Sequence, residues 1–217
     1  MSQNATDWVG QKLEESSDLE IDGRTPEDFL IVRQSMDGYT FLVAVLSLKD
    51  VIRRSDVMAL FAGTNKPQLI VNVPSNTLWS GDAIHYIHGE SAAFGSLGDV
   101  SRAASTGDAG SYRDKNMGFF INAMQQHTNV IDVSYVYDSV FEADRMTGPS
   151  LTVAVIEAYN MSAEDVRNAR ARLGHFDVVV KSTSYGSITS QAEAAAKSMG
   201  AEALKFGDLM GRLSKKK

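Results

Sequence analysis

The chain has 217 residues, of which 43% are hydrophobic and 22% charged, a composition that excludes a disordered chain and a fibrous repeat. Its 21 Lys and Arg against 27 Asp and Glu give a formal charge of −6, the opposite balance from that of most nonspecific nucleic-acid binders. Cysteine is absent, which excludes disulfides, a thiol nucleophile and a thiolate metal site.

The N-terminal residues contain no basic stretch followed by an apolar run, so no secretory signal is expected. The longest apolar stretch, residues 41–48, is far shorter than the ~20 residues of a membrane helix. We therefore expect a cytoplasmic protein that does not bind membranes.

Residue patterns in the first half predict alternating helices and strands. A helix over 7–16, capped by Thr6, precedes two apolar strands over 29–32 and 41–45, and the Asp-Gly pair between these strands is typical of a hairpin turn. The later expected elements are a helix over 50–62 ended by Gly63, a strand over 69–73, a loop over 74–80, a helix over 81–90 and a short strand over 92–94.

Residues 104–113 are small and polar, which predicts a linker between a first half, 1–103, and a second half, 114–217. The two halves could also form one compact domain. The second half is expected to contain a helix over 115–128, strand material over 130–143, a strand over 151–156, a helix over 162–173 that Gly174 ends, a strand over 176–180, a helix over 188–199, a strand over 201–206 and a helical turn over 208–213.

The order of elements in the second half repeats that in the first. When the chain is shifted by 109 residues, 10 of 62 pairs over residues 42–103 are identical, where roughly four are expected by chance. This excess favours an internal duplication, although two generic strand–helix–strand units would also resemble each other. The fold class expected is α/β, with two similar halves and a mainly parallel sheet flanked by helices.

Two loops that follow apolar strands are candidate ligand sites. Ligands of open α/β sheets favour the carboxyl ends of the strands, where helix N-termini offer free N–H groups to anions. The loops at 72–81 and 181–190 are rich in hydroxyl and amide side chains, although such residues also cap helices and stabilise turns. The candidate contacts are Asn72, Ser75, Trp79, Lys181 and Ser184.

A second candidate is a metal-dependent nuclease site. Asp28 begins one strand of the first hairpin and Lys49 follows the other, which resembles the acidic–(Asp/Glu)-x-Lys hairpin of the restriction-endonuclease-like fold. Ser47 stands where the second carboxylate of that pattern belongs. In the second half Glu157 follows the corresponding strand, but no lysine stands two positions later, so each half holds only part of the set.

Other polar residues have simpler interpretations. His85 and His88 lie on one face of a helix but lack a third ligand at metal-site spacing, and no metal site is predicted. Asp99 and Asp208 occupy equivalent repeat positions, as do Asp56 and Asp165; helix capping is the expected role of the first pair, and solvent exposure explains the second. Ser162 followed by Asp165 is also typical of a helix start.

The sequence thus favours a binding or interaction protein that recognises a small anionic or nucleotide-like ligand at the strand-end loops, or a protein partner, including a second copy of the chain. The alternatives are a nuclease-type hydrolase that uses Asp28, Lys49 and Glu157, and a structural subunit of an assembly. The sequence specifies no cofactor.

Overall fold

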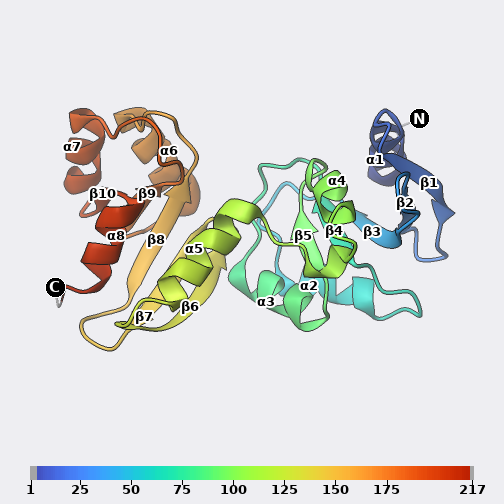
Figure 1. The fold of residues 1–217 in the computed structure, drawn as a ribbon, viewed down its shortest axis with the longest axis horizontal. Helices are drawn as coiled ribbons and strands as arrows, with labels where there is room; N and C mark the ends of the chain where they lie inside the picture. Colours follow the sequence, from blue (N-terminus) through green and yellow to red (C-terminus); the bar gives the residue numbers. More distant parts are fainter. Residues whose placement is uncertain (1–3, 216–217) are drawn as a thin grey trace. The chain divides into compact units, whose positions relative to one another are not determined.

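A computed structural model describes residues 4–215 of the chain. The chain divides into two compact units, Met1–Asp114 and Lys115–Lys217 (Figure 1). Each unit is an α/β structure with one five-stranded sheet flanked by helices.

The first unit begins with a helix, continues with three consecutive strands, and then alternates helices and strands. Its elements are α1 (Ala5–Glu14), β1 (Leu19–Arg24), β2 (Leu30–Gln34), β3 (Thr40–Leu46), α2 (Arg54–Met58), the 3₁₀ turn η1 (Ala59–Phe61), β4 (Leu69–Asn72), α3 (Gly81–Gly89), β5 (Ala93–Gly95), α4 (Asp99–Ala104) and η2 (Ala109–Ser111).

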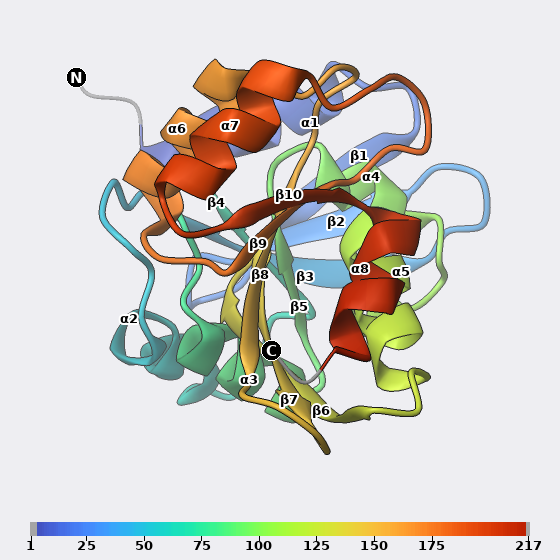
Figure 2. The same ribbon diagram turned by 90° about the vertical axis from the view of Figure 1, so that its left-hand side faces the viewer.

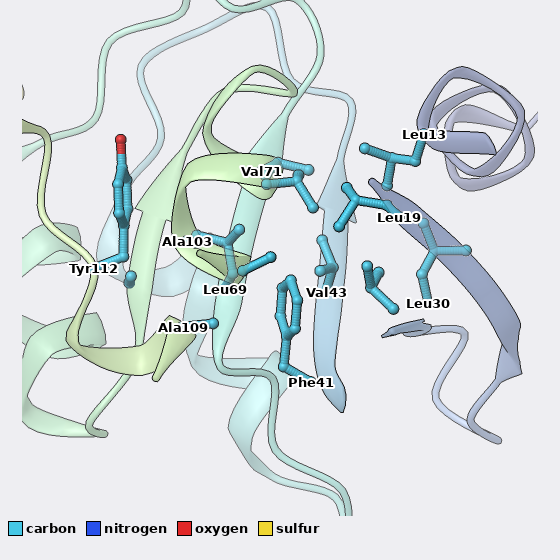
Figure 3. Packing of buried hydrophobic residues seen from close by; sticks show 14 of the residues in the cluster. Leu13, Leu19, Leu30, Phe41, Val43, Leu69, Val71, Ala103, Ala109 and Tyr112 are labelled. Atoms are coloured by element: carbon cyan, nitrogen blue, oxygen red, sulfur yellow. The ribbon is translucent and has the colours of Figure 1, made fainter. Parts of the chain in front are cut away.

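The strands of the first unit lie side by side in chain order, β1-β2-β3-β4-β5. Successive side chains along a strand point to opposite faces of the sheet, and helices cover both faces. Figure 3 shows one core, in which Leu13 of α1 and Ala103 of α4 approach Phe41, Val43 and other side chains of the sheet. Helices α2 and α3 pack on each other and form the other helical layer. Val57 of α2 and Ile84 of α3 are fully buried there.

The second unit has the same succession of element types. Its elements are α5 (Lys115–Gln125), β6 (Val130–Tyr137), β7 (Val140–Arg145), β8 (Leu151–Ile156), α6 (Ala163–Leu173), β9 (Val178–Lys181), α7 (Ser190–Ser198), β10 (Glu202–Lys205) and α8 (Phe206–Leu213). Its sheet order is β10-β9-β8-β7-β6. Helices α5 and α8 contribute Phe120 and Leu209 to the core on one face, and α6 and α7 lie side by side on the other (Figure 2).

The α/β class is confirmed, but a mainly parallel sheet is wrong. Each sheet is mixed: its first three strands pair antiparallel, and the parallel pairing starts at β3–β4 and at β8–β9. In the first sheet the antiparallel part is larger than expected because β1 was missed, and in the second because the strand material expected over 130–143 is a hairpin of β6 and β7. Only Leu19 and Ile21 of this edge strand face inward, between charged residues, so its apolar signal is weak.

The segment 104–113 belongs to the first unit and is not a solvated linker. Ala109 and Tyr112 are buried in the core of that unit, and the Tyr39 hydroxyl accepts a hydrogen bond from the Ala109 amide at 2.8 Å. The small residues of this segment allow it to turn tightly, with the 3₁₀ turn η2 inside it. The compact units meet in sequence at Asp114 and Lys115.

Local helix signals had mixed outcomes. Ser162 and Asp165 form the expected reciprocal cap of α6, and Gly174 follows its last residue with φ of 78°. Helix α1, by contrast, is capped by Asn4, so Thr6 lies inside it. The helix expected over 50–62 is confined to α2 and η1. Within residues 4–215, none of the helices combines the length and the hydropathy of a membrane span.

Candidate functional site

The two candidate loops start from equivalent places in the two sheets. Asn72 is the last residue of β4 and pairs in register with Leu46 of β3, while Lys181 is the last residue of β9 and pairs with Ile156 of β8. Both side chains are 1% exposed. A buried polar group requires hydrogen-bond partners, and in both cases the protein's own loops supply them.

The Lys181 ammonium binds backbone carbonyls. Its Nζ donates to the carbonyl of Thr183 at 2.8 Å and to its hydroxyl at 2.6 Å, and it contacts the carbonyls of Tyr185 and Ala158. Burial, with a smaller contribution from the positive charge of Lys205, lowers the pKa of Lys181. Lys181 therefore joins two loops, 157–160 and 182–186, and its donors face protein oxygens instead of solvent.

Asn72 performs a similar task in the first unit with a neutral amide. Its Nδ2 donates to the carbonyls of Leu48 and Pro74, both at 2.9 Å, and its Oδ1 accepts from the Leu48 amide at 2.9 Å. The Thr77 hydroxyl donates to the same Leu48 carbonyl at 2.7 Å. The loop after β3 is thereby fixed to the loop after β4.

The other three predicted contacts have different environments. Ser75 and Ser184 are exposed on their loops. Trp79 is 4% exposed and packs against Phe94, with ring centroids 5.2 Å apart, so its ring faces the interior. Of the five candidate contacts, only these two serines face solvent. Asn72, Trp79 and Lys181 are buried, and their contacts hold the loops in place.

The two loops of the second unit approach each other closely. Gly186 has φ of 76°, and a Cβ atom there would lie 1.8 Å from the carbonyl oxygen of Tyr159. Asn160 Oδ1 accepts from the amide of Ser187 at 2.9 Å and from its hydroxyl at 3.1 Å. A glycine is thus required for this approach, since any side chain would separate the loops.

Two tyrosines project from these joined loops. Tyr159 is 69% exposed and Tyr185 is 75% exposed. Lys181 contacts the Tyr185 carbonyl and the Tyr159 carbonyl lies against Gly186, so both side chains extend into solvent from backbone that the joined loops hold. Sequence reasoning missed both as contacts; the available signal was an aromatic residue within each otherwise polar loop.

The predicted nuclease residues contact or neighbour other groups within their own units. Asp28 Oδ1 accepts from Arg24 Nη1 at 2.8 Å, and its Oδ2 accepts from the Thr6 hydroxyl at 3.1 Å. Asp28 therefore fixes α1 to the hairpin. Lys49 is exposed beyond the end of β3, and Glu157, in the other unit, accepts from Asn116 at 3.0 Å.

The histidine and carboxylate side chains of the described residues are not arranged as a metal site. Across residues 4–215, no three of them are grouped as a metal ion would require. His85 is exposed, whereas His88 is partly buried, with its ring 5.8 Å from that of Phe94. Burial, together with the charges of Arg113 and His85, lowers the pKa of His88 to about 4, so it is neutral at pH 7.

Two further carboxylates have notable environments. Asp99 accepts from the Tyr112 hydroxyl at 2.6 Å and from the Ser96 amide at 2.7 Å, which indicates a structural role at the start of α4, while Asp208 is exposed. Burial raises the pKa of Asp138 to about 6, although the charge of Arg172 acts in the opposite direction. One oxygen of Asp138 is buried without a hydrogen-bond partner.

Comparison of this chain with protein-family models, with curated proteins and with solved structures gave no match.

Proposed function

We propose that this chain is a binding protein that contacts a protein partner through the joined strand-end loops of its second unit, 157–161 and 182–188. The observation that carries the proposal is the pair of exposed tyrosines on loops that Lys181 holds together. Tyrosine is enriched at protein interfaces because its ring provides a large contact area at a small entropic cost.

The location supports the same proposal. The loops follow the carboxyl ends of the parallel strands β8 and β9, where ligands of α/β sheets commonly bind. Ser184 and Ser187 are exposed on the same loop as Tyr185, and the Ser184 hydroxyl can donate or accept a hydrogen bond at the rim of an interface. A small anionic ligand is less well supported, because the Lys181 ammonium is directed at carbonyl oxygens.

The test is a comparison of the wild type with a Tyr159→Ser, Tyr185→Ser double variant. Met36→Ser is the matched control, since Met36 is 93% exposed but lies in the other unit. Each purified chain is mixed with extract of its source cells, and retained proteins are quantified by mass spectrometry. Native mass spectrometry of the chain alone tests whether the partner is a second copy.

We expect at least one protein, or a second copy of this chain, to be retained by the wild type and by Met36→Ser but not by the double variant. Equal retention by all three chains would refute it.

The repeated element order leads us to propose also that the two units arose by internal duplication. The nuclease and structural-subunit alternatives stay proposals without an observation that favours them.

A further inference from the structure

A hollow of about 320 Å³ lies between helix α1 and the edge strand β1 of the first unit. Its volume is at the lower end of the range for small-molecule sites. Its floor is apolar, with Ile21 of β1 and the buried Leu30 of β2, and its rim is polar, with residues of α1 along one side. An apolar floor with a few polar rim groups is typical of sites for small organic ligands.

Two glycines leave this space open. Gly23 stands at a bulge of β1 with φ of 133°, and a Cβ atom there would contact nothing within 4 Å. Gly10 lies inside α1, where a Cβ atom would make only an ordinary 3.5 Å contact with Leu30. Alanine at position 10 would favour the helix by roughly 1 kcal/mol. A departure from local propensity without a steric cause is a feature of functional sites.

The two carboxylates at the rim of the hollow differ in whether a cation pairs with them. Asp7 and Glu14 stand seven residues apart on α1 and therefore on the same side as Gly10. Asp7 Oδ1 is paired with Arg24 Nη2 at 2.6 Å, and Arg24 also binds Asp28. Glu14 is exposed, and among residues 4–215 no cation pairs with it. The rim thus has an uncompensated carboxylate at one end.

We infer that this hollow binds a small free organic cation: an ammonium group on an apolar body of a few carbon atoms. The body would cover Ile21 and Leu30 in the space left by the two glycines, and the ammonium would pair with Glu14. Residues 1–114 contain 16 acidic and 9 basic side chains, a surplus that attracts cations. The inference is independent of the proposed partner loops, which lie in the other unit.

The test uses benzylammonium as the probe and benzyl alcohol as its neutral counterpart, each titrated into the full ¹⁵N-labelled chain. Amide resonances of Gly10 and Gly23 report binding. We expect benzylammonium to shift both amides saturably and to bind about threefold to fivefold more tightly than the alcohol, the gain typical of an exposed ion pair. No saturable shift at either glycine, or equal affinity for the two probes, would overturn the inference.

Three variants locate the interaction. Gly10→Leu places a side chain in the hollow and is expected to abolish the shift at Gly23, whereas Glu14→Gln is expected to reduce the affinity to that for benzyl alcohol. Glu15→Gln is the matched control, because Glu15 pairs with Lys12 at 2.7 Å and does not line the hollow. Unchanged benzylammonium affinity in Glu14→Gln would contradict the inference even if Gly10→Leu failed to fold.

Discussion

Asn72 and Lys181 hold equivalent loops with side chains of different chemistry. The amide of Asn72 can both donate and accept, and it satisfies three backbone contacts without a charge. The ammonium of Lys181 only donates, so its loops must present oxygen atoms alone, and they do so from Ala158, Thr183 and Tyr185. The consequence is that Lys181 cannot be replaced by an apolar residue of similar size without leaving several carbonyls unpaired.

Lys181→Met is therefore expected to destabilise the second unit by about 3 kcal/mol, since bonds to a charged group are lost and buried acceptors remain. Urea unfolding monitored in that unit measures the change. Lys205→Met is the control, because Lys205 is exposed at the end of the neighbouring strand. A decrease in the free energy of unfolding of less than about 0.5 kcal/mol would mean that water readily replaces the ammonium.

Asp138→Asn is expected to stabilise the protein by about 1–2 kcal/mol at pH 7.5. Burial raises the pKa of Asp138 to about 6, so ionisation at neutral pH opposes folding, and the amide removes that charge. Below pH 4 the carboxyl is protonated in both the folded and the unfolded state, so the gain should disappear there. Thermal unfolding at the two pH values, with the exposed Asp132→Asn as the control, tests this. An equal gain at both pH values would contradict it.

Individual site residues were the hardest features to infer from sequence. Polarity at a strand end is visible, but it does not reveal whether Lys181 faces solvent or the carbonyls of its own loops. Trp79 is similar: its place in a polar loop suggested a ligand contact, whereas it packs on Phe94, more than ten residues away in the chain. Such contacts between distant segments have no local signal.

Capping motifs were more accessible, because their partners lie within three residues of each other. In α2 the Asp56 carboxylate accepts from the Arg53 amide at 2.7 Å, and in α6 that of Asp165 accepts from the Ser162 amide at 2.8 Å. The equivalent pair Asp56 and Asp165 thus shares a capping role, which the helix-start pattern at Ser162 predicted for Asp165 and which solvent exposure did not predict for Asp56. The aspartates expected to share a cap, Asp99 and Asp208, differ in their environments.

Replacement of Asp56 or Asp165 by alanine should each cost about 1 kcal/mol of stability. Asp208→Ala, which removes an exposed carboxylate from the first turn of α8, should change stability by less than about 0.5 kcal/mol. Chemical denaturation of the three variants gives the comparison. If Asp208→Ala proved as damaging as the other two, the different roles assigned to these positions would be wrong.

Elements with strong apolar runs, such as β4 and β9, are predictable because all their residues are buried. Edge strand β1 was not, since its outward Glu20 and Asp22 interrupt the pattern and pair with Arg33 of β2. Those ion pairs depend on the sheet register, which sequence alone does not show. The same omission made the first sheet appear more parallel than it is.

At the scale of the whole molecule, the two units should respond oppositely to acid. His88 of the first unit has a pKa lowered to about 4, below the ordinary value near 6.5. Its contribution to stability is complete above pH 6.5 and is lost as the pH falls toward 4. Asp138 of the second unit has a raised pKa, so its unfavourable contribution declines over the same interval.

When the pH is lowered from 7 to 5, we therefore expect the free energy of unfolding to fall by about 1–2 kcal/mol in the first unit and to rise by about 1 kcal/mol in the second. Amide hydrogen exchange of Ile70 in β4 and Val179 in β9, corrected for intrinsic rates, measures the two units within one chain. His88→Gln should abolish the first change and His85→Gln should preserve it. Parallel losses in both units would contradict this assignment.

The burial of Lys181 also makes it a chemical reporter. An amine-reactive reagent such as acetic anhydride must reach a nitrogen lone pair, and it should label exposed Lys49 at once. The nitrogen of Lys181 becomes accessible only when the loops around it separate. Its acetylation rate, followed by peptide mass spectrometry, would therefore measure how often the tyrosine-bearing loops open. A binding partner that clamps those loops would slow the reaction without touching the lysine.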